Sequence, residues 1–387
     1  MLKGKRFFLV VMVLVLSISL VACGADKGSQ TPAPAKADTV KIGLIIPMTG
    51  ASALYGEQAK SGADLAIKQI NDKGGILGGR KIEVSIQDDK GNPEEGVSLV
   101  KKMIDDGYKY VTGGINSSVT LAQIPVTMEK GVMQVCLSVK APAIRQQGHT
   151  KLFALNTDNL MDGEFFHAII KDQLPYEKIA MMTENTDYGR AEIDALAKHW
   201  ATPDSPKIIT NEMFELTETD FTVLLSKIKA KKPDCLYVCV ASPTLNGTIA
   251  SQAKEVGLNV PILIAPGNLN KDVIKVGGPA TEGIISADVY VNTIDNAENK
   301  EFVEAYKAMF NGKLPEKMEV LGYEIVTLTA TAIDKAGSPD DVQKVVDIMR
   351  STTWKTPRGN ITFDAKGQAQ IGLVPIIVKN GVVVLKQ

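Results

Sequence analysis

Short apolar runs, each followed by a segment with helical periodicity, constrain the fold of this chain more than any other feature. The first run, VKIGLII at residues 40–46, is rich in β-branched side chains and has no polar face. Such a run is typical of a strand covered on both sides by helices, as in a parallel sheet. Apolar residues then recur at helical spacing over residues 57–73, and Gly74-Gly75 ends that helix.

The same alternation continues in two series. The first series continues with KIEVSIQ and with apolar runs at residues 108–111 and 132–137. A second series starts with KIAMMT at residues 178–183. Repeated β-α units imply parallel sheets with right-handed crossovers. Near the end of the chain, Asn380-Gly381 between apolar runs predicts a two-residue hairpin. The predicted fold class is therefore α/β, with two doubly wound parallel-sheet lobes.

The N-terminal segment is typical of an exported lipoprotein. Basic residues precede an apolar run over residues 7–22, and the run stops in LVAC at Cys23. We expect residues 1–22 to be a lipoprotein signal peptide and Cys23 to carry the lipid. Residues 23–38 are rich in Ala, Pro, Ser, Thr and Lys, as in a flexible tether. The alternative is an uncleaved membrane helix, although the run is short for a span of about 20 residues.

Charge and motifs argue against nucleic-acid binding and catalysis. The 43 basic and 44 acidic side chains nearly cancel, so no overall field attracts nucleic acid or an anionic membrane. No zinc-protease, phosphate-loop, dinucleotide-binding or serine-hydrolase motif is present. Cys136, Cys235 and Cys239 are interpreted as small buried hydrophobes rather than as a disulfide or metal set. We therefore predict a non-enzyme without metal or cofactor.

One loop carries a ligand-binding pattern. Gly113-Gly114-Ile115-Asn116-Ser117-Ser118 follows an apolar strand and precedes a helix. Glycines allow close backbone approach, and serine hydroxyls with free helix N–H groups suit a carboxylate. Simple N-capping by Ser117 or Ser118 explains the same pattern, and the spacing alone does not separate the two interpretations.

Taken together, the motifs resemble one family over essentially the whole chain from Asp38. IGLIIPMTGASALYGEQAKSGADLAIKQINDKGGILGGRKIEV is similar to the start of branched-chain amino-acid-type binding proteins of ABC importers, which have the type I periplasmic binding fold. The similarity continues through NTDYGRA, ETDFTVLLSKIKAKKPD, LGYEIVTLTATAI and GNITFDAKGQ. The resemblance implies two lobes joined by a three-strand hinge that close on a small molecule.

The resemblance also implies boundaries, location and partners. Lobe 1 is expected to comprise residues 39–158 plus 289–362, and lobe 2 residues 159–288 plus 363–387. The protein is expected to be a monomer, held by its lipid on the outer face of a bacterial membrane, on the cell surface or in the periplasm. Its partners would be an ABC permease and ATPase complex and a small-molecule ligand.

Carried over by motif, the expected contacts lie on four loops. Tyr55 in ALYGE, Ser117 in GGINSS, and Ser138 with Lys140 in LSVKAP would bind the ligand from the first lobe. Tyr188 in TDYG would form an aromatic wall from the second lobe.

Three departures from the family pattern bear on the ligand. Lys140 replaces the usual Thr, and Asn159 replaces an Asp, while the loop IAPGNLN has no acid for an ammonium. A buried Lys140 would require an anion. We therefore predict an organic or aromatic carboxylate that lacks an amino group. The alternative is an amino acid, with Lys140 turned to solvent or to an acid such as Glu57, and with an acid such as Asp162 meeting the amino group.

Two other functions are alternatives to the role of binding subunit of an importer. One is a ligand-binding module of a sensor or germination-type receptor, and the other is an enzyme on this fold.

Overall fold

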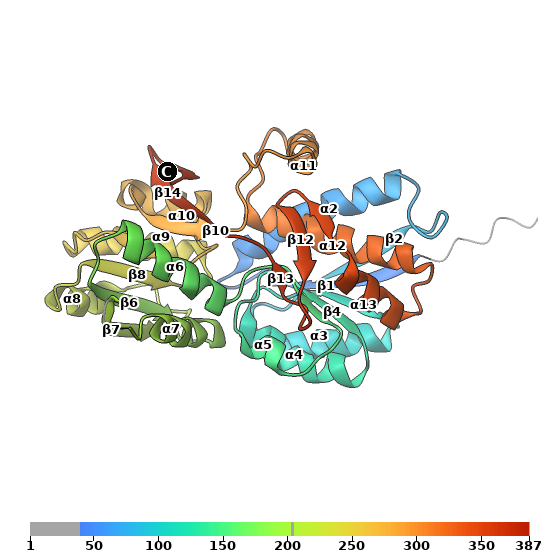
Figure 1. The fold of residues 1–387 in the computed structure, drawn as a ribbon, viewed down its shortest axis with the longest axis horizontal. Helices are drawn as coiled ribbons and strands as arrows, with labels where there is room; N and C mark the ends of the chain where they lie inside the picture. The colour runs from blue at the N-terminus through green and yellow to red at the C-terminus, as the bar shows by residue number, and fades with distance from the viewer. Residues whose placement is uncertain (1–38, 203–204, 387) are drawn as a thin grey trace, which may run out of the picture. The chain divides into compact units, whose positions relative to one another are not determined.

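The computed structural model describes residues 39–386, apart from residues 203–204. The predicted signal peptide, Cys23 and tether lie outside these residues. Two large sheets and one small sheet organise the described chain (Figure 1). We call the five-stranded sheet with its helices the first lobe, and the seven-stranded sheet with its helices the second lobe.

The first lobe is a doubly wound parallel sheet of order β2-β1-β3-β4-β5. Its strands are β1 (Val40–Ile46), β2 (Ile82–Asp88), β3 (Tyr110–Gly113), β4 (Met133–Cys136) and β5 (Leu152–Ala154). Its helices are α2 (Ala53–Asp72), α3 (Pro93–Asp105), α4 (Ser117–Glu129), α5 (Ala143–Gln146), α11 (Ala297–Met309), α12 (Lys317–Ala336) and α13 (Val342–Ser351).

Strand β1 shows why the apolar runs have no polar face. Ile42 and Leu44 pack in the core formed with α2 and α12, whereas Ile45 packs with Val100 and Met103 of α3 on the other side. Figure 1 shows α2 and α12 on one side of this sheet and α3 and α4 on the other. Burial on both faces gives a continuous hydrophobic run, so the prediction of a doubly wound parallel sheet is confirmed.

The second lobe repeats this order and adds two antiparallel strands, giving β15-β14-β10-β9-β8-β6-β7. Its strands are β6 (Lys178–Glu184), β7 (Lys207–Phe214), β8 (Cys235–Cys239), β9 (Ile262–Ile264), β10 (Ile285–Asp288), β14 (Val374–Lys379) and β15 (Val382–Leu385). Its helical segments are α6 (Asn159–Gln173), α7 (Asp187–His199), α8 (Thr222–Ala230), α9 (Pro243–Glu255), α10 (Lys271–Gly277) and the 3-10 turn η1 (Gly278–Thr281). Lys379 pairs with Val382 across the Asn380-Gly381 turn, as the sequence predicts.

The chain passes between the two large sheets three times, at residues 155–158, 289–296 and 371–373, and none of these segments is helix or strand.

The small sheet contains β11 (Trp354–Thr356), β12 (Gly359–Phe363) and β13 (Ala369–Gln370). The expected boundary between residues 362 and 363 is wrong, because it falls inside β12. Phe363 and Ala369 lie in the core of the first lobe, and Gln368 forms a bridge with Ala154.

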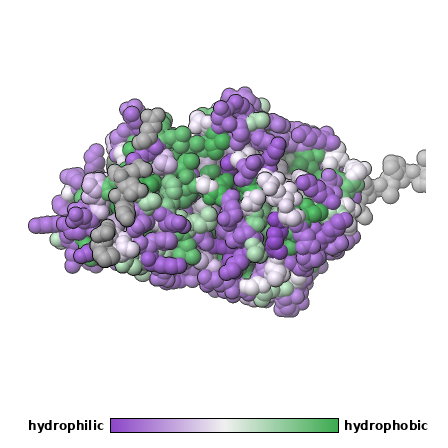
Figure 2. Space-filling view, viewed as in Figure 1, coloured by the Kyte–Doolittle hydropathy of each residue, from purple (hydrophilic) through white to green (hydrophobic). Residues whose placement is uncertain are grey.

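The surface and the interior differ as expected for a globular chain. Hydrophilic residues dominate the face seen in Figure 2, with hydrophobic residues between them. Cys136, Cys235 and Cys239 are buried and free, which agrees with their interpretation as small core residues. Within the described ranges no helix is long and apolar enough to cross a membrane.

Candidate ligand-binding site

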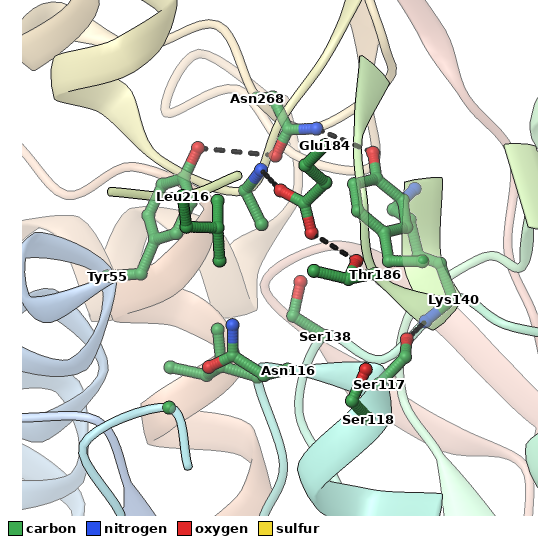
Figure 3. A pocket seen from close by; sticks show the side chains of 14 residues that line it. Tyr55, Asn116, Ser117, Ser118, Ser138, Lys140, Glu184, Thr186, Leu216 and Asn268 are labelled. Carbon is green, nitrogen blue, oxygen red and sulfur yellow. Dashed lines mark hydrogen bonds between the residues drawn. The ribbon is translucent and has the colours of Figure 1, made fainter. Parts of the chain in front are cut away.

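A pocket lies where the carboxyl ends of strands from both lobes meet. In each sheet the strand order reverses beside the first strand of the series, at β1/β3 and at β6/β8, and such switch points are where doubly wound sheets bind ligands. The pocket has an empty volume of about 520 Å³, part of which is open to solvent (Figure 3). Its lining residues are Tyr55, Gly91, Ile115, Asn116, Ser117, Ser118, Ser138, Lys140, Glu184, Thr186, Tyr188, Leu216, Ala241 and Asn268.

The first-lobe side of the pocket contains the start of helix α4. Gly113 has a φ of 126°, and a Cβ there would lie 1.9 Å from the Ile45 carbonyl oxygen, so only glycine fits this turn. Asn116 is the N-cap, but its side chain does not bond the helix. The first N–H groups of α4 have no acceptor within the helix. They therefore suit a ligand carboxylate.

The two serines do not cap the helix, contrary to the simpler interpretation of the motif. Ser117 Oγ accepts from the N–H groups of Lys140 (3.3 Å) and Ala141 (3.2 Å), so it fixes the next loop. Ser118 Oγ accepts from the N–H of Asp187 in the second lobe at 3.3 Å. Ser138 Oγ, on the loop after β4, accepts from Asn156 at 3.1 Å.

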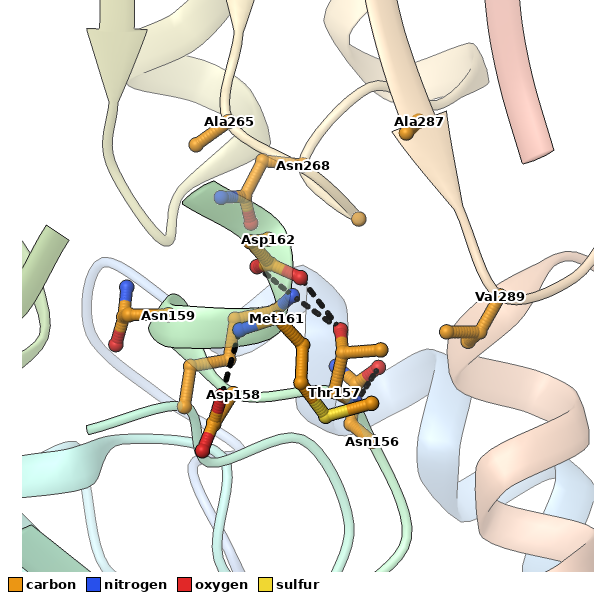
Figure 4. Close-up of polar contacts among 12 residues, drawn as sticks. Asn156, Thr157, Asp158, Asn159, Met161, Asp162, Ala265, Asn268, Ala287 and Val289 are labelled. Atoms are coloured by element: carbon orange, nitrogen blue, oxygen red, sulfur yellow. Dashed lines mark hydrogen bonds and ion pairs between the residues drawn. The ribbon is translucent and has the colours of Figure 1, made fainter. Parts of the chain in front are cut away.

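Lys140 lines the pocket, but its charge is already neutralised within the protein. Its ammonium donates to Asp162 and, at 3.1 Å, to the hydroxyl of Thr157. The Thr157 hydroxyl in turn donates to Asp162 at 2.6 Å, as Figure 4 shows. Lys140 is 3% exposed and Asp162 is fully buried. Desolvation raises the pKa of Asp162, while the Lys140 ammonium lowers it. The inference that Lys140 requires an anionic ligand is therefore wrong, because Asp162 supplies the anion.

Glu184 is the acid that the sequence analysis missed. It is the last residue of β6 and lines the pocket from the second lobe (Figure 3). Its carboxylate accepts from Thr186 Oγ (2.5 Å) and from the N–H of Ala241 (2.6 Å), and only 1% of the residue is exposed. Desolvation raises its pKa. Among the described residues no Lys, Arg or His lies within ion-pair distance of Glu184.

A hydrogen-bonded chain joins the lobes on one side of the pocket. Tyr55 donates to Asn268 Oδ1 (3.2 Å), and the amide nitrogen of Asn268 donates to Tyr188 Oη (2.7 Å). Further bonds cross nearby, from Ser52 to the Ala241 carbonyl and from Gln58 to Asp272, each 2.8 Å long. The two lobes are thus closed on each other around the pocket.

Asn159 takes a different place from the one expected by resemblance. It is fully buried at the start of α6 but is absent from the pocket lining, and its amide donates to Glu192. Glu192 also accepts from Tyr237, and desolvation raises its pKa to about 7. The other five expected contacts, namely Tyr55, Ser117, Ser138, Lys140 and Tyr188, all line the pocket. Across the described part of the chain, no group of three or more His, Cys, Asp or Glu is arranged to hold a metal ion.

Several known proteins that are similar to this chain are named as binding proteins. The leucine-, isoleucine-, valine-, threonine- and alanine-binding protein of Pseudomonas aeruginosa is 32% identical over 333 residues, which cover 86% of this chain and 87% of that protein. The crystal structure of leucine-binding protein LivK from Thermotoga maritima is 25% identical, with a TM-score of 0.83 and coverage of 90% of this chain and 98% of that chain. A solute-binding protein of an ABC transporter from Rhodopseudomonas palustris, in complex with 3,4-dihydroxybenzoic acid, is 26% identical, with a TM-score of 0.79 and coverage of 90% and 96%.

The family model described as periplasmic binding protein matches residues 39–376, which include the first lobe, the second lobe as far as the start of β14, and every residue of the pocket. The predicted fold and resemblance are thereby confirmed. This chain belongs to the periplasmic binding protein family.

Proposed function

We propose that the protein is the solute-binding subunit of an ABC importer, anchored through a lipid on Cys23 outside the cytoplasmic membrane. Two lobes that meet around a small pocket suit capture and release of a solute by opening at the three crossings. Residues 24–38 would then tether the binding domain close to its permease and ATPase. We expect it to act as a monomer, because one chain supplies both walls of the pocket.

We further propose that the ligand is an α-amino acid, in preference to the carboxylate without an amino group expected from the sequence. The observation that carries this proposal is Glu184, a buried acid that faces the pocket and has no cationic partner among the residues the structure describes. A buried carboxylate that lacks a counter-charge is costly, and a ligand ammonium would supply that charge. The ligand carboxylate would lie against the first turn of α4, with Ser117 and Ser138 nearby.

An aromatic carboxylate is the second candidate. The raised pKa of Glu184 favours its neutral form, which needs no ammonium partner. The likeness to the solute-binding protein in complex with 3,4-dihydroxybenzoic acid supports the same alternative. Only the amino-acid candidate carries an amino group, so a pair of ligands that differ in this group alone separates the two proposals.

A melting-temperature panel on the purified domain tests the choice. Leucine and 4-methylpentanoate form a matched pair, since the second molecule is leucine without its amino group, and benzoate represents the aromatic acids. A ligand that binds only the folded state at a hundredfold excess over Kd adds about 2.7 kcal/mol of stability. We expect leucine or another amino acid to give the largest shift. A larger shift with benzoate or 4-methylpentanoate than with every amino acid would refute the amino-acid proposal and leave the solute-binding role intact.

A further inference from the structure

A lysine of the second lobe pairs with two carboxylates of the first lobe, outside the ligand pocket. Lys271 begins helix α10, which packs in the second lobe, whereas Glu316 and Glu319 stand at the start of α12 in the first lobe (Figure 1). The Lys271 ammonium lies 2.9 Å from the Glu316 carboxylate and 3.4 Å from that of Glu319. The backbone N–H of Lys271 also donates to Glu316, at 3.1 Å. We call these three residues the interlobe bridge.

The carboxylates of the interlobe bridge are less exposed than the lysine. The side chain of Lys271 is 51% exposed, that of Glu316 22% and that of Glu319 3%. Desolvation raises the pKa of Glu319 to about 7 against the lowering effect of Lys271, and the charge of Glu316 adds to the rise. The two acids are therefore close enough to repel each other, and the ammonium between them offsets that repulsion.

Both sides of the interlobe bridge are held on fixed backbone. Asn270 caps the start of α10 by accepting from two backbone N–H groups, each at 3.1 Å. In the first lobe, the N–H of Glu316 donates to Glu319 at 3.1 Å. Helix α12 lies so close to α2 that a Cβ on Gly62 would be 1.8 Å from the Glu319 carbonyl oxygen. Because neither helix end can follow the other, opening of the lobes has to separate Lys271 from the two carboxylates.

The interlobe bridge does not touch a ligand in the pocket. All three of its residues line a solvent-open groove between the lobes, and none of them lines the ligand pocket. An effect of the bridge on ligand affinity therefore has to act through the closure of the lobes. When a ligand binds only the closed arrangement, its apparent Kd rises as the closed fraction of the ligand-free protein falls.

We propose that Lys271 is a positioning residue that raises ligand affinity from outside the pocket, by pairing with Glu316 and Glu319 only when the lobes are closed. The interlobe bridge stabilises the closed arrangement, so a larger fraction of the ligand-free domain has the pocket assembled. The effect on affinity rests on the proposed solute-binding role, whereas the effect on closure depends on no ligand.

The test compares wild type with Lys271→Met, Lys271→Arg and Lys275→Met at about pH 8, where Glu319 is ionised. Methionine removes the charge and arginine retains it, while Lys275 is an exposed lysine of α10 that does not line the groove. Small-angle scattering measures the compactness of the ligand-free domain, and calorimetric titration measures its affinity for leucine. Lys271→Met should expand the domain or bind leucine about three- to tenfold more weakly, with Lys271→Arg and Lys275→Met within about twofold of wild type.

The two measurements cover both starting points. If the ligand-free wild type is mainly open, loss of the interlobe bridge lowers affinity, and if it is mainly closed, the loss expands the domain. A loss of affinity should shrink in about 1 M salt, which screens a half-exposed ion pair but does not replace a lost packing contact.

Three results would overturn the proposal: no change in either measurement, an equal change in Lys275→Met, or a loss of affinity that salt leaves untouched. If the wild type binds no amino acid, the proposed ligand is refuted separately. The scattering comparison then decides on the interlobe bridge, and equal compactness of wild type and Lys271→Met overturns it.

Discussion

Replacing Glu184 by Gln removes one charge from the pocket and keeps the shape of the side chain. In the proposed complex, Glu184 faces the ligand ammonium in a site where the residue is only 1% exposed. Truncating one partner of a buried charge pair costs about 2–5 kcal/mol of binding free energy. At about 1.4 kcal/mol per tenfold change, leucine should bind about 30 to 4,000 times more weakly to Glu184→Gln.

The same substitution should have the opposite effect on the ligand-free domain. Burial raises the pKa of Glu184 in the folded state, so the folded protein holds this proton to higher pH than the unfolded chain does. Stability then falls as pH rises from the ordinary glutamate pKa through the raised folded value, and the cost is complete above that value. Glu184→Gln lacks this cost. Without ligand, it should therefore be more stable than wild type at neutral pH, with the advantage vanishing in acid.

Calorimetric titration and urea unfolding measure the two effects on the same samples. The matched ligand is 4-methylpentanoate, whose binding should not weaken in Glu184→Gln, because it has no ammonium. The matched variant is Glu218→Gln, which changes an exposed acid outside the pocket and should alter neither quantity. Equal weakening of leucine and 4-methylpentanoate, or unchanged leucine affinity, would refute the pairing of Glu184 with an ammonium.

Three other predictions follow from the structure and the sequence. Asp162→Ala leaves the Lys140 ammonium buried without its partner and should lower the free energy of unfolding by about 3–5 kcal/mol in urea titration, whereas a loss under about 1 kcal/mol would show that the pair is not buried in solution. Gly322→Ala puts a Cβ 1.9 Å from the Ala59 carbonyl oxygen and should cost about 1–3 kcal/mol by the same assay, with unchanged stability contradicting the close helix crossing. Cys23→Ser should abolish lipid labelling in cells and release the domain from the membrane or leave its leader uncleaved, and undiminished labelling would contradict the anchor.

The fold was predictable because its signals are local. The run at β1 has no polar face because both faces of the sheet are covered, and Asn380-Gly381 marks a turn whose residues both have positive φ, 54° and 71°. Such features depend on neighbouring residues and can be recognised without knowing the fold. The boundary between the lobes, in contrast, has no local signal in the sequence. The strand β12 belongs to the first lobe through contacts with residues far away in sequence, so its end could not be placed within the lobe from composition alone.

The candidate site was predictable only in part, for the same reason. Tyr55, Ser117, Ser138 and Tyr188 stand in motifs that resemble the family, and each of them lines the pocket. The partner of Lys140 could not be identified, because Asp162 comes from a helix 22 residues further along the chain.

Glu184 was missed although a local signal existed. It ends an apolar strand immediately before the NTDYG motif, at the carboxyl end where ligands bind. Attention to the residue types at strand ends, in addition to motifs in loops, would have identified it.

The most direct test of the central claim is a calorimetric titration of the purified wild-type domain with leucine, followed by mass spectrometry of the recovered solute. The account predicts saturable binding of one amino acid per chain, with the solute returned unchanged. Absence of binding to leucine and to the other amino acids titrated in the same way, or chemical conversion of the bound solute, would contradict it.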